Sequence, residues 1–439
     1  MDKNEYHRRR EKLFETIGDG VAILPAYDYK TMSNDVHYEF RQQSDFLYFT
    51  GFEEPNSVAL FEGSKEKKYS LFVPKKDKNF EIWNGRRYGV EGAIKIFGAD
   101  EAFQIEEFEG KFKEIVKKYT DVSFPKGENV KFENLVLSII SNVSKSKERQ
   151  GQDPINITDL TYDLHKIRLI KSEYELNIIR KSAEISSNAM ILGMKVTKVG
   201  MKESDVEAVI EYQYAKYGAV RPAYPSIVGA GENATILHYI KNNDYLKNND
   251  LLLIDAGAEY LGYASDITRT WPINGKFTDE QKEIYEIVLN CQKRCIEAVK
   301  PGVTINILQK LAVEEISKGI LKLGLVEGDL STIIDEEKYK RYFMHGIGHF
   351  LGLDVHDTSM LGRDYELTEN SYITIEPGIY IPNEDDIPIG YRGIGIRIED
   401  DILVTVDGNE NLTKKVPKEI SEIERIVGTI ELPRANILF

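Results

Sequence analysis

The pattern of hydrophobic and polar positions changes near residue 160. Before that point, short apolar runs alternate with charged amphipathic segments, which is typical of strands and helices packed in a mixed α/β domain. We expect helices over residues 5–17 and 101–119. We expect strands in VAILPA (21–26), in KKYSLFVPKK (67–76) and on both sides of Gly51 in SDFLYFTGFEEPNSVALFEG (44–63).

A polar stretch, SKSKERQGQDPINITD (144–159), separates this part from the rest of the chain. It contains Gly151 and Pro154 and shows no apolar period, as expected of a linker or a surface loop. A chain of 439 residues is also long for a single hydrophobic core. We therefore expect two domains, over residues 1–160 and 161–439.

After the boundary, one order of helices and strands occurs twice. Capping boxes, in which Ser or Thr is followed three residues later by Glu or Gln, predict helix starts at Ser172, Ser204 and Thr278. A further helix is expected from about Ile305 to Leu323. In each half, two helices precede strands that carry two carboxylates. The second domain is therefore predicted to be α+β, with two halves related by a pseudo-twofold axis and the helices outside.

The strands of each half carry a pair of acidic residues at a symmetric spacing. Asp255 and Asp266 lie symmetrically about the YL of GAEYLGYA, and Glu376 and Glu399 about the loop NEDDIPIG. Residues opposed across a hairpin have Cβ atoms about 4.5–5.5 Å apart and point to one face. Hairpins turning at these midpoints would place Asp255 opposite Asp266 and Glu376 opposite Glu399.

Four carboxylates set in apolar strands indicate a metal centre. Burying such pairs is costly because desolvation and like-charge repulsion add, and two divalent cations would neutralise the four charges. For any one of these carboxylates, the alternative is an exposed group paired with Arg or Lys. His349, in the glycine-rich MHGIGHFLGLDVHD (344–357), could complete the ligand set. Four oxygen ligands and one nitrogen favour a hard ion such as Mn²⁺ over thiolate-bound Zn²⁺.

Histidines gather in the same part of the chain. Four of the seven are His238, His345, His349 and His356. A single histidine is most often an ordinary surface or core residue, but four beside a carboxylate cluster indicate a functional site. HGIGH lacks the glutamate of HExxH, which excludes the zinc-helix class of metalloproteases.

Charge and composition restrict the partners and the compartment. A net charge of −15 argues against binding to nucleic acid or to an anionic membrane. The N-terminal MDKNEYHRRREKLFETIGDG lacks the apolar core of a signal peptide, and no stretch approaches the roughly 20 apolar residues of a membrane span. Cys291 and Cys295 fall on the apolar face of a predicted helix, as reduced core residues would. We expect a cytoplasmic protein.

The chain closely resembles the aminopeptidase P family, the Xaa-Pro aminopeptidases among the pita-bread metallopeptidases. Five ligand positions in this order and spacing make a highly specific match, and the resemblance covers nearly the whole chain. It implies a pita-bread catalytic domain behind a smaller N-terminal domain. The matching motifs are FRQQSDFLYFTGF (40–52), EIWNGRR (81–87), ILHY (236–239), IDAGAEYLGYASDITRTWP (254–272), MHGIGHFLGLDVHD (344–357), IEPGIYI (375–381) and YRGIGIRIEDDILV (391–404).

The resemblance implies a dinuclear metal site. Two divalent ions about 3.5 Å apart would be bridged by Asp266, Glu399 and a hydroxide. Asp255 would bind one ion, and His349 and Glu376 the other. The hydroxide would attack the carbonyl before proline, with Glu376 as the proton shuttle.

The resemblance also implies roles for residues around the metals. His238 and His356 match histidines that hold the substrate and stabilise the tetrahedral intermediate, and His345 matches one that lines the proline pocket. Tyr380 and Arg397 match residues around the metal site and the substrate. The expected catalytic residues are His238, His356, Glu376 and Arg397, and the expected substrate-binding residues here are His238, His345, His356, Tyr380 and Arg397.

Three further positions match the family near its substrate channel: Asp35, Trp83 and Arg168. Because a neighbouring subunit supplies part of this lining in the family, the resemblance implies a homotetramer or a homodimer. Trp83 could equally be a core aromatic, and Asp35 and Arg168 a structural ion pair.

The nearest alternative is a Xaa-Pro dipeptidase (prolidase), which restricts the same chemistry to dipeptides. The EIWNGRR segment and the loop lengths favour the aminopeptidase. Creatine amidinohydrolase and non-catalytic pita-bread proteins that bind partners lack metal ligands, whereas all five are present here. Methionine aminopeptidases lack the N-terminal domain. The expected substrates are therefore peptides with proline in the second position.

Overall fold

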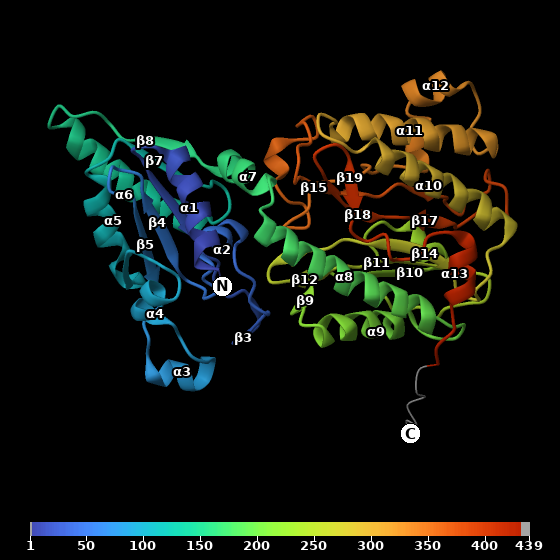
Figure 1. Ribbon diagram of the computed structural model, residues 1–439, viewed down its shortest axis with the longest axis horizontal. Helices are drawn as coiled ribbons and strands as arrows, with labels where there is room; N and C mark the ends of the chain where they lie inside the picture. Colours follow the sequence, from blue (N-terminus) through green and yellow to red (C-terminus); the bar gives the residue numbers. More distant parts are fainter. Residues whose placement is uncertain (1, 432–439) are drawn as a thin grey trace. The chain divides into compact units, whose positions relative to one another are not determined.

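The computed structural model describes residues 2–431 of the chain. The chain forms two compact units, which divide between Ile167 and Arg168. Each unit has a hydrophobic core of its own, as expected of domains of this size. Figure 1 shows the elements of both units.

The first unit is built on a mixed six-stranded sheet with the order β6-β5-β4-β1-β7-β8 (Figure 1). Strand β4 pairs antiparallel with β1 and β5, whereas β6, β7 and β8 are added in parallel. The strands are β1 Val21–Pro25, β2 Thr31–Ser33, β3 Val36–His37, β4 Val58–Glu62, β5 Lys68–Val73, β6 Glu101–Gln104, β7 Asp121–Phe124 and β8 Asn156–Asp159. The helices are α1 Lys3–Ile17, α2 Ser44–Thr50, α3 Lys78–Asn84, α4 Gly89–Lys95, the 3₁₀-helix η1 Ile105–Glu107, α5 Phe108–Val116, α6 Val130–Glu148 and α7 Thr161–Leu169.

Three expectations for this unit are wrong. Residues 144–159, expected as a linker or a surface loop, contain the end of α6 and the strand β8. SDFLYFT forms the helix α2 and not a strand, because the side chain of Gln43 accepts a hydrogen bond from the N–H of Phe46 (2.6 Å) and caps the helix. The segment 101–119 is helical only in part, since β6 precedes α5 and pairs with β5. Strand β6 lies at the edge of the sheet, where charged residues are tolerated and hide a strand pattern.

In the second unit, the strands lie between α8 and α9 on one side and α10 and α11 on the other (Figure 1). This arrangement is the pseudo-twofold α+β fold predicted from the repeated order of elements. The helices are α8 Glu173–Val196, α9 Glu203–Lys216, α10 Asp279–Ala298, α11 Ile305–Lys322, α12 Leu330–Asp335 and α13 Ile420–Ile426, with 3₁₀-helices η2 Gly231–Thr235, η3 Lys338–Arg341 and η4 Ser359–Leu361. The strands are β9 Arg221–Pro222, β10 Ile227–Ala230, β11 Leu251–Asp255, β12 Ala258–Tyr260, β13 Tyr263–Ala264, β14 Thr268–Pro272, β15 Tyr372–Ile375, β16 Gly378–Tyr380, β17 Gly395–Arg397, β18 Asp400–Val404 and β19 Asn409–Asn411.

Two of the three predicted capping boxes are confirmed. Ser172 caps α8 and Thr278 caps α10, each with the reciprocal side chain three residues later. Ser204 is not a cap, because α9 begins one residue earlier, at Glu203. The Asp205 carboxylate accepts the N–H of Lys202 (2.8 Å) and so fixes the earlier start.

The two hairpins differ in register. In the second hairpin, Ile375 pairs with Asp400 and Gly378 with Arg397. The pairs before and after Glu376 have the same register, which places Glu376 across from Glu399, as predicted.

In the first hairpin, Asp255 lies opposite Thr268 and not opposite Asp266, so that prediction is wrong. The cause is the turn. Tyr260 pairs with Tyr263, so the chain reverses at Leu261 and Gly262, one residue later than the predicted midpoint.

Among the described helices, none is long and apolar enough to cross a membrane. Cys291 and Cys295 lie buried in α10 as free thiols, in agreement with the predicted core role. Both belong to the core that packs the helices of the second unit against its strands.

Candidate metal centre

A cavity of about 570 Å³ in the second unit is lined by residues of both hairpins. It brings together four segments of the sequence: residues 223–240, the first hairpin, the histidine segment and the second hairpin. The predicted site residues that line it are Asp255, Asp266, His349, Glu376, Glu399, His238, His345, His356 and Arg397.

Three of the predicted ligands surround the imidazole of a fourth, His349. Asp266, His349 and Glu399 each offer one ligand atom, and these atoms lie within 4.8 Å of one another. The Nε2 atom of His349 lies 3.5 Å from Asp266 Oδ2 and 3.6 Å from Glu376 Oε1. Burial disfavours the charged imidazole, yet the carboxylates of Asp266 and Glu376 raise the pKa of His349 to about 9.

Backbone pairing fixes the position and the tautomer of His349. Its segment runs beside β15, where Thr374 N donates to His349 O (2.9 Å) and Glu376 N donates to Ile347 O (2.8 Å). The Nδ1 atom of His349 lies 3.0 Å from the carbonyl oxygen of Phe350, so Nδ1 carries the proton. With its pKa raised to about 9, His349 also carries a proton on Nε2, which faces the carboxylates. A bound cation would replace that proton and take the Nε2 lone pair, as at a metal-ligating histidine.

Tyr224 is a site residue that the sequence analysis missed. Its hydroxyl lies 2.6 Å from Asp255 Oδ1 and also contacts Asp266 Oδ1, which ties the diagonal aspartate pair together. Burial raises the pKa of Tyr224 well above its usual range, and the two aspartates add to the shift. No motif marks this tyrosine, because it lies just after the short strand β9, outside both carboxylate strands.

The charges of the cluster fit divalent cations. Burial raises the pKa of Glu399 well above its usual range, and repulsion from Asp266 and Glu376 adds to it. Burial likewise raises the pKa of Glu376 to about 7 and raises the pKa of Asp255. Arg397 offsets part of this negative charge, with Nη2 2.6 Å from Asp255 Oδ2. Four carboxylates and one imidazole form a donor set for hard divalent ions, which would favour the charged forms.

His345, Tyr380 and Arg397 form a chain of hydrogen bonds beside the cluster. Burial and the charge of Arg397 lower the pKa of His345 to about 3, so its ring is neutral. Nδ1 donates to Gly346 O (2.8 Å), and Nε2 accepts from the hydroxyl of Tyr380 (2.8 Å). That hydroxyl accepts in turn from Arg397 Nη1 (2.7 Å). Tyr380 therefore acts through its neighbours, since among the described residues it is not part of the cavity lining.

His238 and His356 also lie at the cavity wall. The ring of His356 packs edge-on against the ring of His349, with centroids 4.5 Å apart. Burial and the neighbouring His349 lower the pKa of His356. His238 is exposed on the segment that follows η2.

Comparisons with known proteins agree with this site. Residues 177–406 match Metallopeptidase family M24, and residues 6–123 match the aminopeptidase P N-terminal domain. The chain belongs to metallopeptidase family M24. The Xaa-Pro aminopeptidase of Escherichia coli (strain K12) is 39% identical over 432 residues, which cover 97% of this chain and 98% of that protein.

Solved structures of similar proteins also match over nearly the whole chain. An aminopeptidase of Pseudomonas aeruginosa has a TM-score of 0.93 at 42% identity, covering 97% of this chain and 98% of that one. Escherichia coli aminopeptidase P in complex with substrate has a TM-score of 0.93 at 39% identity, with the same coverage of 97% and 98%. The family and the fold predicted from the motifs are thus confirmed, including the N-terminal domain.

Glu203, a second residue that the sequence analysis missed, holds the segment that carries His238 in this M24 site. Its side chain is fully buried, and all four of its hydrogen bonds come from the segment 230–244. The donors are Ala230 N (2.8 Å), Asn233 Nδ2 (3.0 Å), Tyr239 Oη (2.9 Å) and Asp244 N (2.9 Å).

Of the three remaining predicted residues, Asp35 and Trp83 belong to the first unit and Arg168 to the second. Trp83 on α3 is 86% exposed, so the alternative of a core aromatic is wrong. Asp35 is exposed in the turn between β2 and β3. Arg168 is buried and, among the described residues, does not line the cavity. It pairs with Asp354 (2.7 Å) and with Asp357, the neighbour of His356.

Proposed function

We propose that the protein is a Xaa-Pro aminopeptidase, which removes the N-terminal residue from peptides with proline in the second position. The observation that carries this proposal is the convergence of five metal-ligand side chains, three further histidines and an arginine on one cavity. Full-length similarity to the Escherichia coli Xaa-Pro aminopeptidase supports the proline specificity.

Two divalent cations suit the donor set of this cavity. Asp255, Asp266, His349, Glu376 and Glu399 would hold them. The chemistry that such a pair supplies is Lewis-acid activation of a water molecule and of the scissile carbonyl. We propose Mn²⁺ as the ion, because carboxylate-rich sites with a single imidazole favour hard cations.

The chain itself supplies proton transfer, positioning and substrate binding. Glu376 lines the cavity and takes the proton-transfer role. His238 and His356 lie at the cavity wall, where imidazole N–H groups can donate to the substrate carbonyl as negative charge develops on its oxygen. Arg397 holds the Asp255 carboxylate in place through its 2.6 Å ion pair.

A proline ring suits the wall beside His345. The bond before proline is a tertiary amide without an N–H, so the site needs no acceptor at that position. Both ring nitrogens of His345 are engaged by Gly346 and Tyr380, which leaves an uncharged ring face for the substrate. Leu237 and Val355 add apolar lining to the same cavity.

A substrate panel tests this function. The Mn²⁺-loaded protein is incubated with Xaa-Pro-Yaa tripeptides, with Xaa-Pro dipeptides and, as a matched control, with Xaa-Ala-Yaa tripeptides. We expect release of the first residue from Xaa-Pro-Yaa, with a much lower kcat/KM for Xaa-Ala-Yaa. Cleavage of the dipeptides alone would identify a prolidase and contradict the aminopeptidase.

We further propose a homotetramer or a homodimer in the cytoplasm. Helix α3 exposes Ile82 (77%) and Trp83 (86%) side by side, and exposed apolar groups of this kind are typical of subunit contacts. The free thiols of Cys291 and Cys295 support a reducing compartment.

A further inference from the structure

Thr268 is a fully buried residue of β14 that contacts two charged groups of the site with one hydroxyl. Its Oγ1 lies 2.7 Å from Glu399 Oε2 and 3.1 Å from Arg397 Nε. The hydroxyl therefore sits between a carboxylate of the metal cluster and the arginine that pairs with Asp255.

The direction of these two hydrogen bonds is fixed by chemistry. A guanidinium has no acceptor, so the Thr268 hydroxyl must accept from Arg397. Its single proton is then committed to Glu399. The bond from Arg397 is assisted by charge, and the bond to Glu399 is as well when a bound cation keeps that carboxylate ionised, which makes both stronger than bonds between neutral groups.

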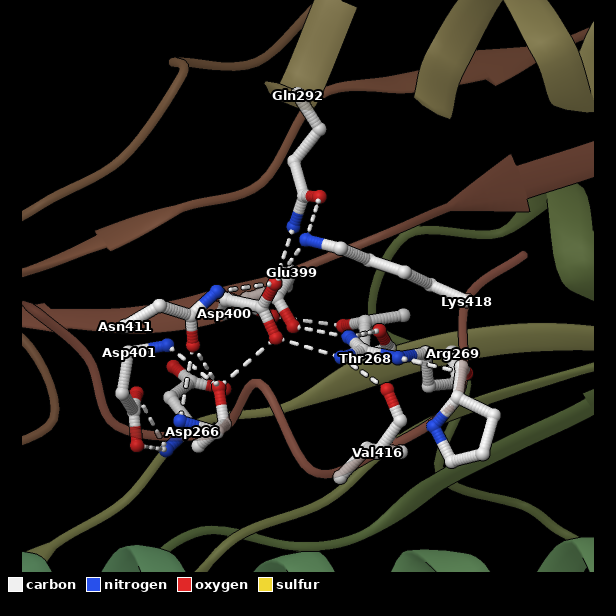
Figure 2. Close-up of polar contacts among 12 residues, drawn as sticks. Asp266, Thr268, Arg269, Gln292, Glu399, Asp400, Asp401, Asn411, Val416 and Lys418 are labelled. Atoms are coloured by element: carbon white, nitrogen blue, oxygen red, sulfur yellow. Dashed lines mark hydrogen bonds and ion pairs between the residues drawn. The ribbon is translucent and has the colours of Figure 1, made fainter. Parts of the chain in front are cut away.

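The backbones of Thr268 and Glu399 are held together as well. Glu399 N donates to Thr268 O (3.0 Å). Arg269 Nη1 donates to Thr268 O (2.9 Å) and to Glu399 O (2.5 Å). The Nη2 of Arg269 is paired with Asp400, in the buried network that Figure 2 shows. The hydroxyl of Thr268 thus meets the Glu399 carboxylate from a fixed position.

The link continues from one hairpin to the other. Arg397 Nη2 bonds Asp255 Oδ2 (2.6 Å), Arg397 Nε bonds the Thr268 hydroxyl, and that hydroxyl bonds Glu399. One carboxylate from each hairpin is therefore oriented through the same arginine and the same threonine. Hydrogen bonds to the outer side of metal ligands set their orientation and their affinity for the ion.

We propose that Thr268 is a positioning residue of the metal centre, which orients the Glu399 carboxylate for cation binding and couples it to Arg397. The proposal rests on the proposed function, because it takes Glu399 as a metal ligand. The role of the threonine is specific to its hydroxyl, since a methyl group of the same size could make neither bond.

The test compares Thr268→Val, which removes the hydroxyl at nearly constant volume, with Thr268→Ser, which retains it. The apparent Kd for Mn²⁺ is measured by calorimetric titration of the metal-free full-length chain. We expect Thr268→Val to raise the Kd by roughly 10–100-fold, the usual cost of losing an outer hydrogen bond to a ligand. Thr268→Ser should bind Mn²⁺ close to the parent level.

Thr270→Val is the matched control. Thr270 is also fully buried on β14, but within residues 2–431 its hydroxyl bonds only the backbone of Arg397. We expect this control to change the melting temperature of the metal-free chain as Thr268→Val does, with a Kd for Mn²⁺ near the parent value.

Two results would overturn the positioning role: parent affinity in Thr268→Val, or equal weakening in Thr268→Val and Thr270→Val. A Glu399→Ala variant in the same titration separates this failure from a failure of the proposed function. If Glu399→Ala binds Mn²⁺ as the parent does, Glu399 is not a ligand, and both proposals are wrong.

Discussion

The two hairpins of the second unit bring their carboxylates to the site through different registers. Glu376 lies directly across from Glu399, whereas Asp266 lies two residues from the position opposite Asp255. Side chains along a strand alternate between its faces, so a displacement of two residues keeps both aspartates on one face. The comparison shows that both carboxylates of a hairpin must point to the same face of the sheet. They need not lie directly opposite each other.

The diagonal pair, Asp255 and Asp266, is bridged by a side chain from a third segment. Diagonal neighbours across two strands lie about 7–8 Å apart, and aspartate is shorter than glutamate by one methylene. In the first hairpin, the hydroxyl of Tyr224 spans this gap by contacting both Asp255 and Asp266. The difference in register thus explains why a tyrosine belongs to one half of the site.

The hairpins also hold each other's backbone. The amide of Asp266, in the first hairpin, donates to the carboxylate of Asp401 in the second (3.1 Å). The carbonyl of Glu399, in the second hairpin, accepts from Arg269 in the first (2.5 Å). Each half therefore fixes a predicted ligand of the other, and Figure 2 shows the two contacts as parts of one buried network.

The largest expected effect on stability follows from breaking this network at Asp400. Its carboxylate is fully buried and accepts from Arg269 (2.5 Å), Lys418 (2.6 Å) and Gln292 (3.0 Å). Asp400→Asn would leave the buried Arg269 and the partly buried Lys418 without their counter-charge. We expect a loss of about 3–5 kcal/mol in the free energy of unfolding, measured by denaturant titration of the metal-free chain.

Asp407→Asn provides the control for Asp400→Asn, because Asp407 is exposed in the loop between β18 and β19. It should change the free energy of unfolding by no more than about 0.5 kcal/mol. Equal stability of the two variants would show that the ion pair does not support the second hairpin.

A smaller effect is expected where the strands of the first hairpin approach most closely. A Cβ atom on Gly257 would lie 1.6 Å from the carbonyl oxygen of Ser265, so Gly257→Ala must push the strands apart. We expect a loss of about 1–3 kcal/mol in the same unfolding measurement.

The control for Gly257→Ala is Gly110→Ala in α5. A Cβ there would have nothing within 4 Å, and alanine favours the helix by up to about 1 kcal/mol. If Gly257→Ala were as stable as the parent, the close approach of the two strands would not constrain the first hairpin.

Features set by neighbouring residues could be predicted from the sequence. The helix starts at Ser172 and Thr278 follow from capping boxes of four residues. The opposition of Glu376 and Glu399 is predicted from the midpoint of the two positions, and the register of their hairpin confirms it. The register of the first hairpin could not be predicted by symmetry. Leu261 and Gly262 both adopt positive φ (49° and 87°), and this backbone conformation sets the position of the turn.

Contacts between residues far apart in the sequence could not be predicted, because they leave no local sequence pattern. Arg269 and Asp400 are 131 positions apart, as are Thr268 and Glu399. Tyr224 reaches the aspartates from the segment that follows a strand of only two residues, Arg221–Pro222. These residues became visible only when folding placed them beside the predicted ligands, which the motifs had already marked.

The most direct test of the dinuclear site is elemental analysis of metal content, carried out together with hydrolysis of a Xaa-Pro-Yaa tripeptide. The parent chain should hold about two divalent ions and cleave the tripeptide, and chelation should abolish cleavage until metal is restored. Glu399→Ala should lose bound metal, with an activity loss larger than the roughly 10–100-fold cost of removing an outer hydrogen bond. Full activity of the metal-free parent, or a Glu399→Ala variant with two ions and full activity, would contradict the account.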